Sequence, residues 1–194
     1  AEEILQQALR YKRYWGKKGG ITVSGGEALL QIDFVTELFT LAKEKGVNTC
    51  LDTSGNPFTR EEPFYSKFEK LMEVTDLFML DIKEIDEDEH KQLTGQTNKN
   101  ILDMATCLSD HGKAMWIRHV LVPGITDDDG QLHRLRAFID TLKTVERVEI
   151  LPYHTLGVFK WKELGIPYAL EDVEPPTKEQ VEHAREIIIP GYKS

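Results

Sequence analysis

A pair of glycines followed by a carboxylate interrupts the first β-type run of the sequence. The run Ile-Thr-Val-Ser at 21–24 leads directly into Gly25, Gly26 and Glu27. Two glycines let backbone N–H and C=O groups approach a bound molecule because no Cβ stands in the way, and Glu27 adds a fixed hydrogen-bond acceptor. Glycine pairs are more often simple turns, so this motif indicates a ligand site only if the ends of other strands agree with it.

Polar side chains also end other β-type runs. Asp52 ends the second run, Asp81 and Lys83 end the third, and His154 follows a Leu-Pro-Tyr corner after the last. Asp81 and Lys83 are two residues apart, so they share one face of an extended strand. A lysine beside carboxylates suits a ligand that carries both an amino and a carboxylate group. Taken singly, Asp52 fits a loop cap equally well, and Lys83 fits a solvated side chain.

A charged pair interrupts the otherwise apolar run at 116–122. Arg118 and His119 are adjacent in the sequence. Because successive side chains of a strand point to opposite faces, only one of the two can point toward the inside of a barrel. The sequence leaves open which one does.

β-type runs and helical segments alternate along the chain, and this alternation must position the polar residues. The runs span 21–24, 47–52, 77–82, 115–122 and 148–151. Amphipathic periodicity and capping residues predict helices over 33–45, 100–111 and 177–188, and a further helix that Thr126 caps. Such an alternation predicts an α/β fold with one parallel sheet and right-handed crossovers. Ligands of these folds collect at the carboxyl ends of the strands.

Composition narrows the classes of protein that the chain can belong to. Its 194 residues are 40% hydrophobic and 29% charged, which predicts a single globular domain over 1–194. The formal net charge of −9 disfavours binding to nucleic acid or to an acidic membrane surface. No run approaches the ~18 apolar residues that cross a bilayer, so we expect a cytoplasmic protein. The two cysteines, Cys50 and Cys107, are too far apart in sequence to suggest a disulfide framework.

Segments along nearly the whole chain resemble one family, the activating enzymes of pyruvate formate-lyase, within the radical S-adenosylmethionine superfamily. Ala28 after Gly-Gly-Glu is typical of these activators, because many other members of the superfamily have proline there. The matching segments, in the family's order, are Ile-Thr-Val-Ser-Gly-Gly-Glu-Ala (21–28), Thr-Cys-Leu-Asp-Thr (49–53), Val-Thr-Asp-Leu (74–77), Met-Leu-Asp (79–81), Trp-Ile-Arg (116–118), Val-Pro-Gly (122–124) and Leu-Pro-Tyr-His (151–154).

The resemblance implies a fold, cofactors and partners. The fold is a partial (β/α)6 barrel, here truncated at its N-terminal strand, that binds S-adenosylmethionine beside a 4Fe-4S cluster. An electron donor such as flavodoxin or ferredoxin reduces the cluster in this family. The resulting 5′-deoxyadenosyl radical removes a hydrogen atom from a glycine of pyruvate formate-lyase, which leaves a stable glycyl radical on that partner. The protein itself needs to supply position and electrostatics.

The resemblance also assigns roles by matched position. Gly26, with its neighbours Gly25 and Glu27, is expected along the amino end of the cofactor's methionine. His154 is expected to contact the cofactor from the last strand, so Gly26, Lys83 and His154 should face one cavity. The remaining cofactor pocket is expected from Asp81, Ile82 and Lys83. A possible monovalent-cation site is expected from Asp52, Thr53, Met79 and Asp81.

One departure from the family pattern concerns the cluster. The family holds it with a Cys-x-x-x-Cys-x-x-Cys motif, and this sequence has no such motif. Cys50 and Cys107 cannot replace three converging thiolates. Because Ala1 also begins directly in a helical segment, we expect a C-terminal fragment of a longer protein that is inactive by itself, with cluster ligands outside this chain.

Three other hypotheses remain open at this point. A related activator of a different glycyl radical enzyme would share most of these strand ends. A metal-dependent barrel hydrolase or lyase would use Asp52, Asp81 and His154 as ligands. Finally, the fragment could be a non-catalytic module that docks on a glycyl radical enzyme.

Overall fold

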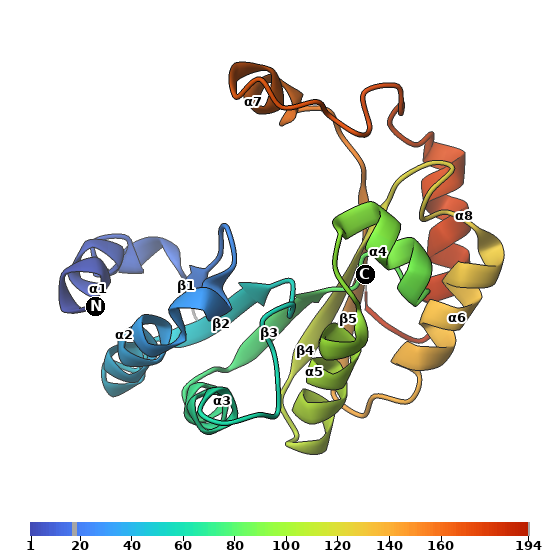
Figure 1. Ribbon diagram of the computed structural model, residues 1–194. Helices are drawn as coiled ribbons and strands as arrows, with labels where there is room; N and C mark the ends of the chain where they lie inside the picture. The colour runs from blue at the N-terminus through green and yellow to red at the C-terminus, as the bar shows by residue number, and fades with distance from the viewer. Residues whose placement is uncertain (17–18, 194) are drawn as a thin grey trace.

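The computed structural model describes residues 1–16 and 19–193, and within these ranges five parallel strands form one curved sheet (Figure 1). The strands follow one another in the sheet in sequence order. This confirms the prediction of a parallel-sheet α/β fold with the architecture of a partial barrel. The strands are β1 Gly20–Val23, β2 Asn48–Thr53, β3 Leu77–Asp81, β4 Met115–Leu121 and β5 Val145–Pro152.

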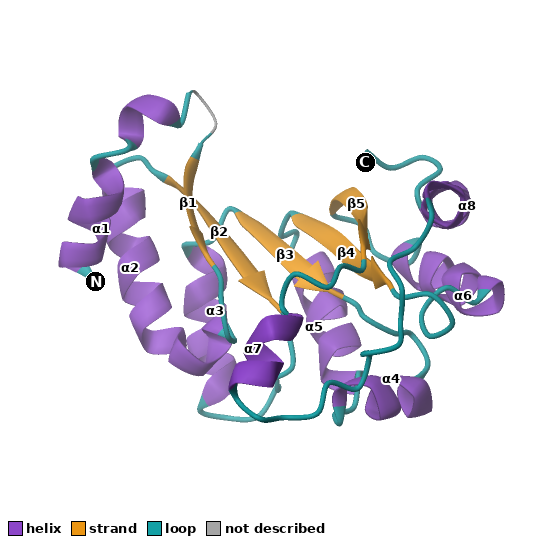
Figure 2. Ribbon diagram, turned by 90° about the horizontal axis from the view of Figure 1, so that it is seen from above, coloured by secondary structure: helices purple, strands orange, loops and turns teal. Residues whose placement is uncertain are grey.

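Helices connect the strands and cover one face of the sheet. Figure 2 shows α2, α3, α5 and α6 on the same side of the sheet, as repeated right-handed crossovers require. No helix in the described part of the chain is long and apolar enough to cross a membrane. The α-helices are α1 Glu2–Leu9, α2 Ile32–Glu44, α3 Phe64–Glu73, α4 Glu87–Thr94, α5 Lys99–Asp110, α6 Asp129–Ile139, α7 Val158–Glu163 and α8 Lys178–Ile188, and the short 3-10 helices are η1 Lys12–Tyr14 and η2 Ala28–Gln31.

The core lies between the helices and the face of the sheet that they cover. In α2, Val35, Leu38 and Phe39 are buried at helical spacing, as its amphipathic pattern predicts. Phe34, which the same pattern places on the apolar face, is instead 37% exposed. Buried side chains from the strands complete the core, including Leu51, Phe78, Leu80, Ile117 and Val148.

The N-terminal cap that the sequence predicts is confirmed at α8 but not at α6. Thr177 caps α8 in a capping box with Gln180. The prediction that Thr126 caps the next helix is wrong, because Asp128 caps α6 by accepting a hydrogen bond from the backbone N–H of Gln131 at 3.0 Å. Thr126 is buried, and its hydroxyl accepts from the N–H of Val122 at 2.8 Å. The threonine therefore closes the turn after β4 and leaves the cap to the aspartate.

The opposite face of the sheet carries the polar residues. Alternation along β2 buries Thr49, Leu51 and Thr53 on the helix-covered side and leaves Cys50 and Asp52 on the other. The same alternation continues in β3 and β4. We call this side the inner face of the sheet, because it corresponds to the interior of a closed barrel. Charged side chains therefore line part of the inner face.

Candidate functional site

An arginine joins two aspartates across three neighbouring strands at the inner face. Arg118 Nε donates to Asp81 Oδ1 at 2.8 Å, and Arg118 Nη1 donates to Asp52 Oδ2 at 3.2 Å. Arg118 lies directly opposite Asp81 in the register of β3 and β4. Burial opposes the charged guanidinium, but Asp81 and Asp52 outweigh it and raise the pKa of Arg118. The guanidinium stays charged and holds both carboxylates in place.

The choice between Arg118 and His119 is thereby settled by the structure. Arg118 points to the inner face, and His119 is buried on the other side. His119 Nδ1 lies 3.0 Å from the carbonyl oxygen of Ile82, and Nε2 lies 3.0 Å from that of Thr126. Burial lowers the pKa of His119, in spite of these two carbonyls. A neutral ring carries one N–H, so His119 donates to one of these two carbonyl oxygens, either at the end of β3 or in the turn after β4.

A small cavity adjoins Asp81 at the carboxyl ends of β2 and β3. It has a volume of about 170 Å³, and Asp81 and Lys83 both line it. Lys83 Nζ lies 3.3 Å from Asp81 Oδ2, so a donor and an acceptor of opposite charge stand side by side at its wall. Ile82 lies between them with its side chain in the core, 1% exposed. The other lining residues are Ser54, Asn56, His90, Thr94, Gln96 and Ile101.

Glu27 connects the glycine turn to the end of β2. Its carboxylate accepts hydrogen bonds from the N–H of Leu29 at 3.0 Å, the hydroxyl of Thr53 at 2.5 Å and the N–H of Ser54 at 2.9 Å. The acceptor that the sequence suggests for a ligand is therefore engaged by the protein itself. Glu27 caps η2 and fixes the turn that precedes it.

The glycines of this turn leave their backbone open. Gly25 and Gly26 have φ values of 91° and 51°, which favour glycine. A Cβ added to either residue would meet no atom of the protein within 4 Å. Both residues are also exposed, as a backbone contact to a ligand requires.

Only some of the residues expected to hold a monovalent cation lie close together. Asp52 and Asp81 share the guanidinium of Arg118. The side chain of Thr53 points to the opposite face, where it donates to Glu27. Met79 lines a different cavity of about 710 Å³ at the amino ends of the strands, together with Trp116. The cation site stays a prediction.

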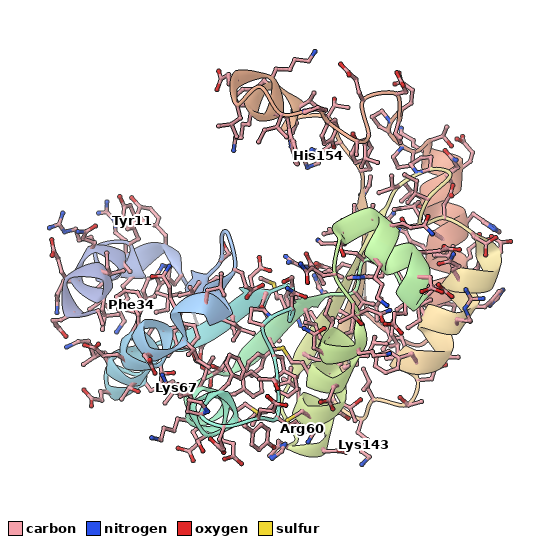
Figure 3. The ribbon with its side chains drawn as sticks, in the orientation of Figure 1. Tyr11, Phe34, Arg60, Lys67, Lys143 and His154 are labelled. Atoms are coloured by element: carbon pink, nitrogen blue, oxygen red, sulfur yellow. The ribbon has the colours of Figure 1, made fainter. Side chains whose placement is uncertain are left out.

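His154 lies apart from the other predicted site residues. It is exposed and follows β5 in the segment that leads to α7 (Figure 3). It does not line the cavity of Asp81 and Lys83, and neither does Gly26. The structure thus brings together Asp52, Asp81 and Lys83 but does not place Gly26 and His154 around the same cavity. Its arrangement also separates His154 from the two aspartates that the metal-hydrolase hypothesis requires, and the described residues contain no cluster of three metal-ligating His, Cys, Asp or Glu side chains.

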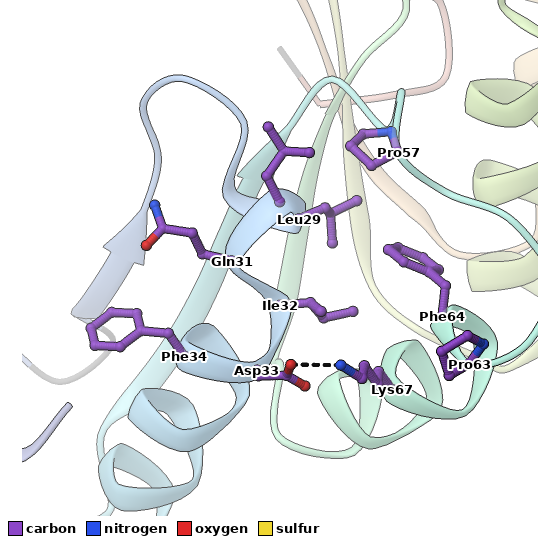
Figure 4. Close-up of a pocket in the computed structure, with 10 residues that line it drawn as sticks. Leu29, Gln31, Ile32, Asp33, Phe34, Pro57, Pro63, Phe64 and Lys67 are labelled. Atoms are coloured by element: carbon purple, nitrogen blue, oxygen red, sulfur yellow. Dashed lines mark hydrogen bonds and ion pairs between the residues drawn. The ribbon is translucent and has the colours of Figure 1, made fainter.

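A third cavity lies between η2 and α3, away from these charges. Its volume is about 540 Å³, and its lining is largely apolar, with Leu29, Ile32 and Phe64 among its residues (Figure 4). Lys67 Nζ and Asp33 Oδ2 form an ion pair across its rim at 2.6 Å. The smaller cavity remains the better candidate for a cofactor, because charged groups converge on it.

Comparisons with known proteins identify the family. The Radical SAM superfamily matches residues 1–135. Over 188 residues the chain is 57% identical to the pyruvate formate-lyase-activating enzyme of Streptococcus mutans, which covers 97% of this chain and 72% of that protein. The chain belongs to this family of activating enzymes, within the radical SAM superfamily.

A second relative agrees with this chain in sequence, and a solved structure agrees with it in fold. The pyruvate formate-lyase-activating enzyme of Listeria monocytogenes is 50% identical over 189 residues, or 97% of this chain and 76% of that protein. A crystal structure of a domain of the pyruvate formate-lyase-activating enzyme from Bacteroides vulgatus superimposes with a TM-score of 0.72. At 21% identity, covering 90% of this chain and 96% of that one, it supports the fold alone.

The cysteines of this family member do not suit a 4Fe-4S cluster. Cys50 lies on the inner face of β2, and Cys107 is buried in α5, behind the sheet. Burial raises the pKa of both thiols, which opposes the thiolate that iron needs. Three converging thiolates cannot come from these 194 residues, which contain two cysteines.

Sequence reasoning misses two parts of this site. His90 comes from α4, a polar helix that Asp86 caps at its start and Gly95 at its end. Its sequence lacks an apolar period, but the Asp86 cap and the Gly95 stop are the signals that could have found it. Ser54 and Asn56 follow Asp52 in the sequence, so a search of all residues after each strand would have included them.

Proposed function

We propose that this chain binds S-adenosylmethionine as part of an enzyme that activates pyruvate formate-lyase. The identity of 57% with the Streptococcus mutans activating enzyme, over nearly the whole chain, carries the proposal. When bound, S-adenosylmethionine supplies the radical precursor for removing a hydrogen atom from a glycine of that partner. The chain's own residues bind and orient this cofactor.

The strand ends supply groups that match the cofactor's charges. The ammonium of Lys83 attracts the carboxylate of the methionine, and Asp81 accepts from hydrogen-bond donors. Arg118 positions Asp81 from the next strand. The open peptide groups at Gly25 and Gly26 accept or donate along the amino end of the methionine. These roles are consistent with a site whose protein groups need only hold the reacting molecule.

Finer features belong to the same proposal. We assign His154 to the cofactor once the segment before α7 approaches the strand ends. We also assign a monovalent cation to the carboxylates of Asp52 and Asp81. Flavodoxin or ferredoxin would serve as electron donor. We also propose one domain over residues 1–194 and a cytoplasmic location, where free thiols such as Cys50 and Cys107 are usual.

Equilibrium binding tests the proposal directly. Titration calorimetry of the 194-residue chain with S-adenosylmethionine should show saturable binding, and Lys83→Ala should weaken it about tenfold or more, as loss of a charge-assisted hydrogen bond predicts. Lys143→Ala is the control, because Lys143 is 76% exposed and its nearest ion-pair partner is Asp110 at 3.5 Å. Equal affinities for the wild type and the Lys83 variant would contradict the assignment.

A further inference from the structure

The segment between β5 and α8 contains an arm that stands away from the sheet. The arm comprises residues 154–167 and includes α7. Figure 1 shows it above the inner face of the sheet, and Figure 2 shows α7 beyond the carboxyl ends of β2 and β3. Every residue of the arm is exposed except Val158, which is half-buried. The arm therefore has little contact with the body of the protein.

Aromatic residues hold the base of the arm together. The hydroxyl groups of Tyr153 and Tyr168, which flank the arm on either side, lie 2.9 Å apart, and Tyr153 is buried. The ring of Tyr168 packs against that of Trp161 in α7, with 5.4 Å between the ring centroids. The two ends of the arm are thus joined to each other and to α7, so that the arm can move as one body about its base.

The arm carries much of the exposed apolar surface of the protein. In the described ranges, 1–16 and 19–193, ten large apolar side chains are exposed, and five of them lie between residues 156 and 166. Apolar side chains that are concentrated in this way mark a surface that becomes covered. The five are Leu156, Phe159, Trp161, Leu164 and Ile166.

A second apolar surface is open at the same end of the sheet. The cavity between η2 and α3 follows the carboxyl ends of β1 and β2, and its lining includes Leu29, Pro57 and Phe64 (Figure 4). Leu30 also lines this cavity and is 74% exposed. The volume of about 540 Å³ is in the range of pockets that receive a bound group, so apolar side chains of the arm can enter it.

The arm is long enough to reach that cavity. Neighbouring strands lie about 4.8 Å apart, so the path from β5 to β2 and β1 is about 15–20 Å. Residues 154–157 span up to about 13 Å when extended, and α7 adds about 9 Å. On this path the arm crosses the small cavity of Asp81 and Lys83, at the ends of β2 and β3.

His154 connects the position of the arm to a bound molecule. It is the first residue of the arm, and Figure 3 shows its ring on the side of the arm that faces the sheet. Movement of the arm toward the strand ends carries this ring toward the small cavity. A molecule bound there gains the contact with His154 when the arm is closed, and this difference in contacts favours the closed position.

We propose that the arm is a lid, in which residues 154–167 close over the strand ends when S-adenosylmethionine binds and the apolar side chains of the arm pack into the cavity between η2 and α3. This inference rests on the proposed function, because binding of the same cofactor drives the closure. The closed lid excludes water from the small cavity and buries two apolar surfaces against each other.

Limited proteolysis follows the position of the arm. Trypsin cleaves after lysine, and Lys160 and Lys162 of α7 are both exposed. Saturating S-adenosylmethionine should slow cleavage at both residues about tenfold, because the rate of cleavage tracks the fraction of molecules in which the arm is open. Cleavage after Lys143, an exposed residue before β5, should keep its rate.

Two exposed leucines provide a matched pair of variants. Leu164 on the arm is 72% exposed and Leu30 on the cavity is 74% exposed, so neither substitution removes a core contact. Leu164→Ala and Leu30→Ala should each reduce the protection of Lys160 about threefold, because less apolar surface is buried on closure. The double variant should lose less than the product of the two effects, because both leucines belong to one closed interface.

An exposed aliphatic residue on another element serves as the control. Ile4 lies on α1 and is exposed, and Ile4→Ala should leave the protection of Lys160 unchanged. Urea unfolding of each variant checks that the chain still folds, so that a lost lid contact is distinguished from a lost structure.

The outcomes distinguish the lid from the proposed function. If calorimetry shows binding of S-adenosylmethionine but Lys160 and Lys162 are cleaved at an unchanged rate, the lid alone is overturned. The lid is also overturned if only added pyruvate formate-lyase slows the cleavage, since the arm is then a docking surface for that partner. Full protection in both leucine variants would overturn the packing of the arm into the cavity. If the wild-type chain does not bind S-adenosylmethionine, the proposed function and the lid both fail.

Discussion

Arg118 and Asp81 lie directly opposite each other on β4 and β3, and Arg118 Nε donates to Asp81 Oδ1 at 2.8 Å. The same guanidinium reaches Asp52 on β2. One cation therefore balances two carboxylates at a face of the sheet where all three side chains are less than a quarter exposed. Removal of the arginine, or of either aspartate, leaves the remaining charges incompletely neutralised.

Replacement of the arginine tests this arrangement. Arg118→Ala should lower the free energy of unfolding by about 3 kcal/mol, because it leaves the partly buried carboxylate of Asp52 unpaired and that of Asp81 with Lys83 alone. Urea denaturation measures the change. The control is Arg60→Ala, which breaks a pair of similar geometry between Arg60 and Asp103 at 2.8 Å, where both side chains are more than 40% exposed. This variant should cost under about 1 kcal/mol, and equal losses would show that the inner-face pair has no special importance.

Substitution of Glu27 should loosen the glycine turn. Glu27→Gln keeps the size of the side chain but replaces one accepting oxygen with a donor that faces the donors of Thr53 and Ser54. We expect a loss of about 1–3 kcal/mol in the free energy of unfolding, together with weaker binding of S-adenosylmethionine. Glu37→Gln, on the exposed side of α2, should change neither quantity. A Glu27 variant with wild-type stability would mean that these contacts are dispensable.

The buried His119 predicts a dependence of stability on pH. Burial lowers its pKa in the folded state, and the unfolded chain has a histidine pKa of about 6.5. As pH falls through that value, the unfolded state takes up the proton first, so the contribution of His119 to stability is present above about pH 6.5 and is lost on acidification toward the folded pKa.

Unfolding midpoints measured between pH 7.5 and pH 5 would detect this effect. His119→Gln should flatten the decrease that the wild type shows, although the variant is less stable at every pH because the ring's hydrogen-bond geometry is lost. His133→Gln, at an exposed position of α6, should keep the wild-type slope. Parallel curves for the wild type and the His119 variant would assign the pH dependence to other groups.

From the positions of the two thiols we predict that this chain does not assemble an iron–sulfur cluster. After anaerobic incubation with iron and sulfide, the 194-residue chain should show no cluster absorbance, because Cys50 and Cys107 lie on opposite sides of the sheet. Cys50→Ser and Cys107→Ser should give the same spectra as the wild type. Absorbance that disappears in either variant would reveal a cluster ligand that the structure does not suggest.

Much of the fold follows from the sequence because apolar residues recur with different periods in strands and in amphipathic helices. The five β-type runs coincide with β1 to β5 within a few residues, and Thr177 marks the start of α8. The polar helix α4 has no apolar stripe to reveal it. Thr126 illustrates a different limit, since a threonine caps a helix or closes a turn according to where the backbone goes next.

The candidate site is predictable in its location but not in its contacts. Asp52, Asp81 and Lys83 stand at strand ends, as the fold rule requires. The partner of the two aspartates depends on the register between β3 and β4, which the sequence does not specify. Glu27 is identified as an important residue. Apart from the nearby Leu29, however, its donors come from residues 53 and 54, and contacts of such long sequence separation are invisible to local patterns.

The bonds of Glu27 have a mechanical consequence. A single carboxylate joins the start of η2, which follows the glycine turn, to the first residues after β2, so these two segments do not shift independently of each other. A molecule that pushes against the glycine turn would therefore also displace Ser54, on the rim of the neighbouring cavity.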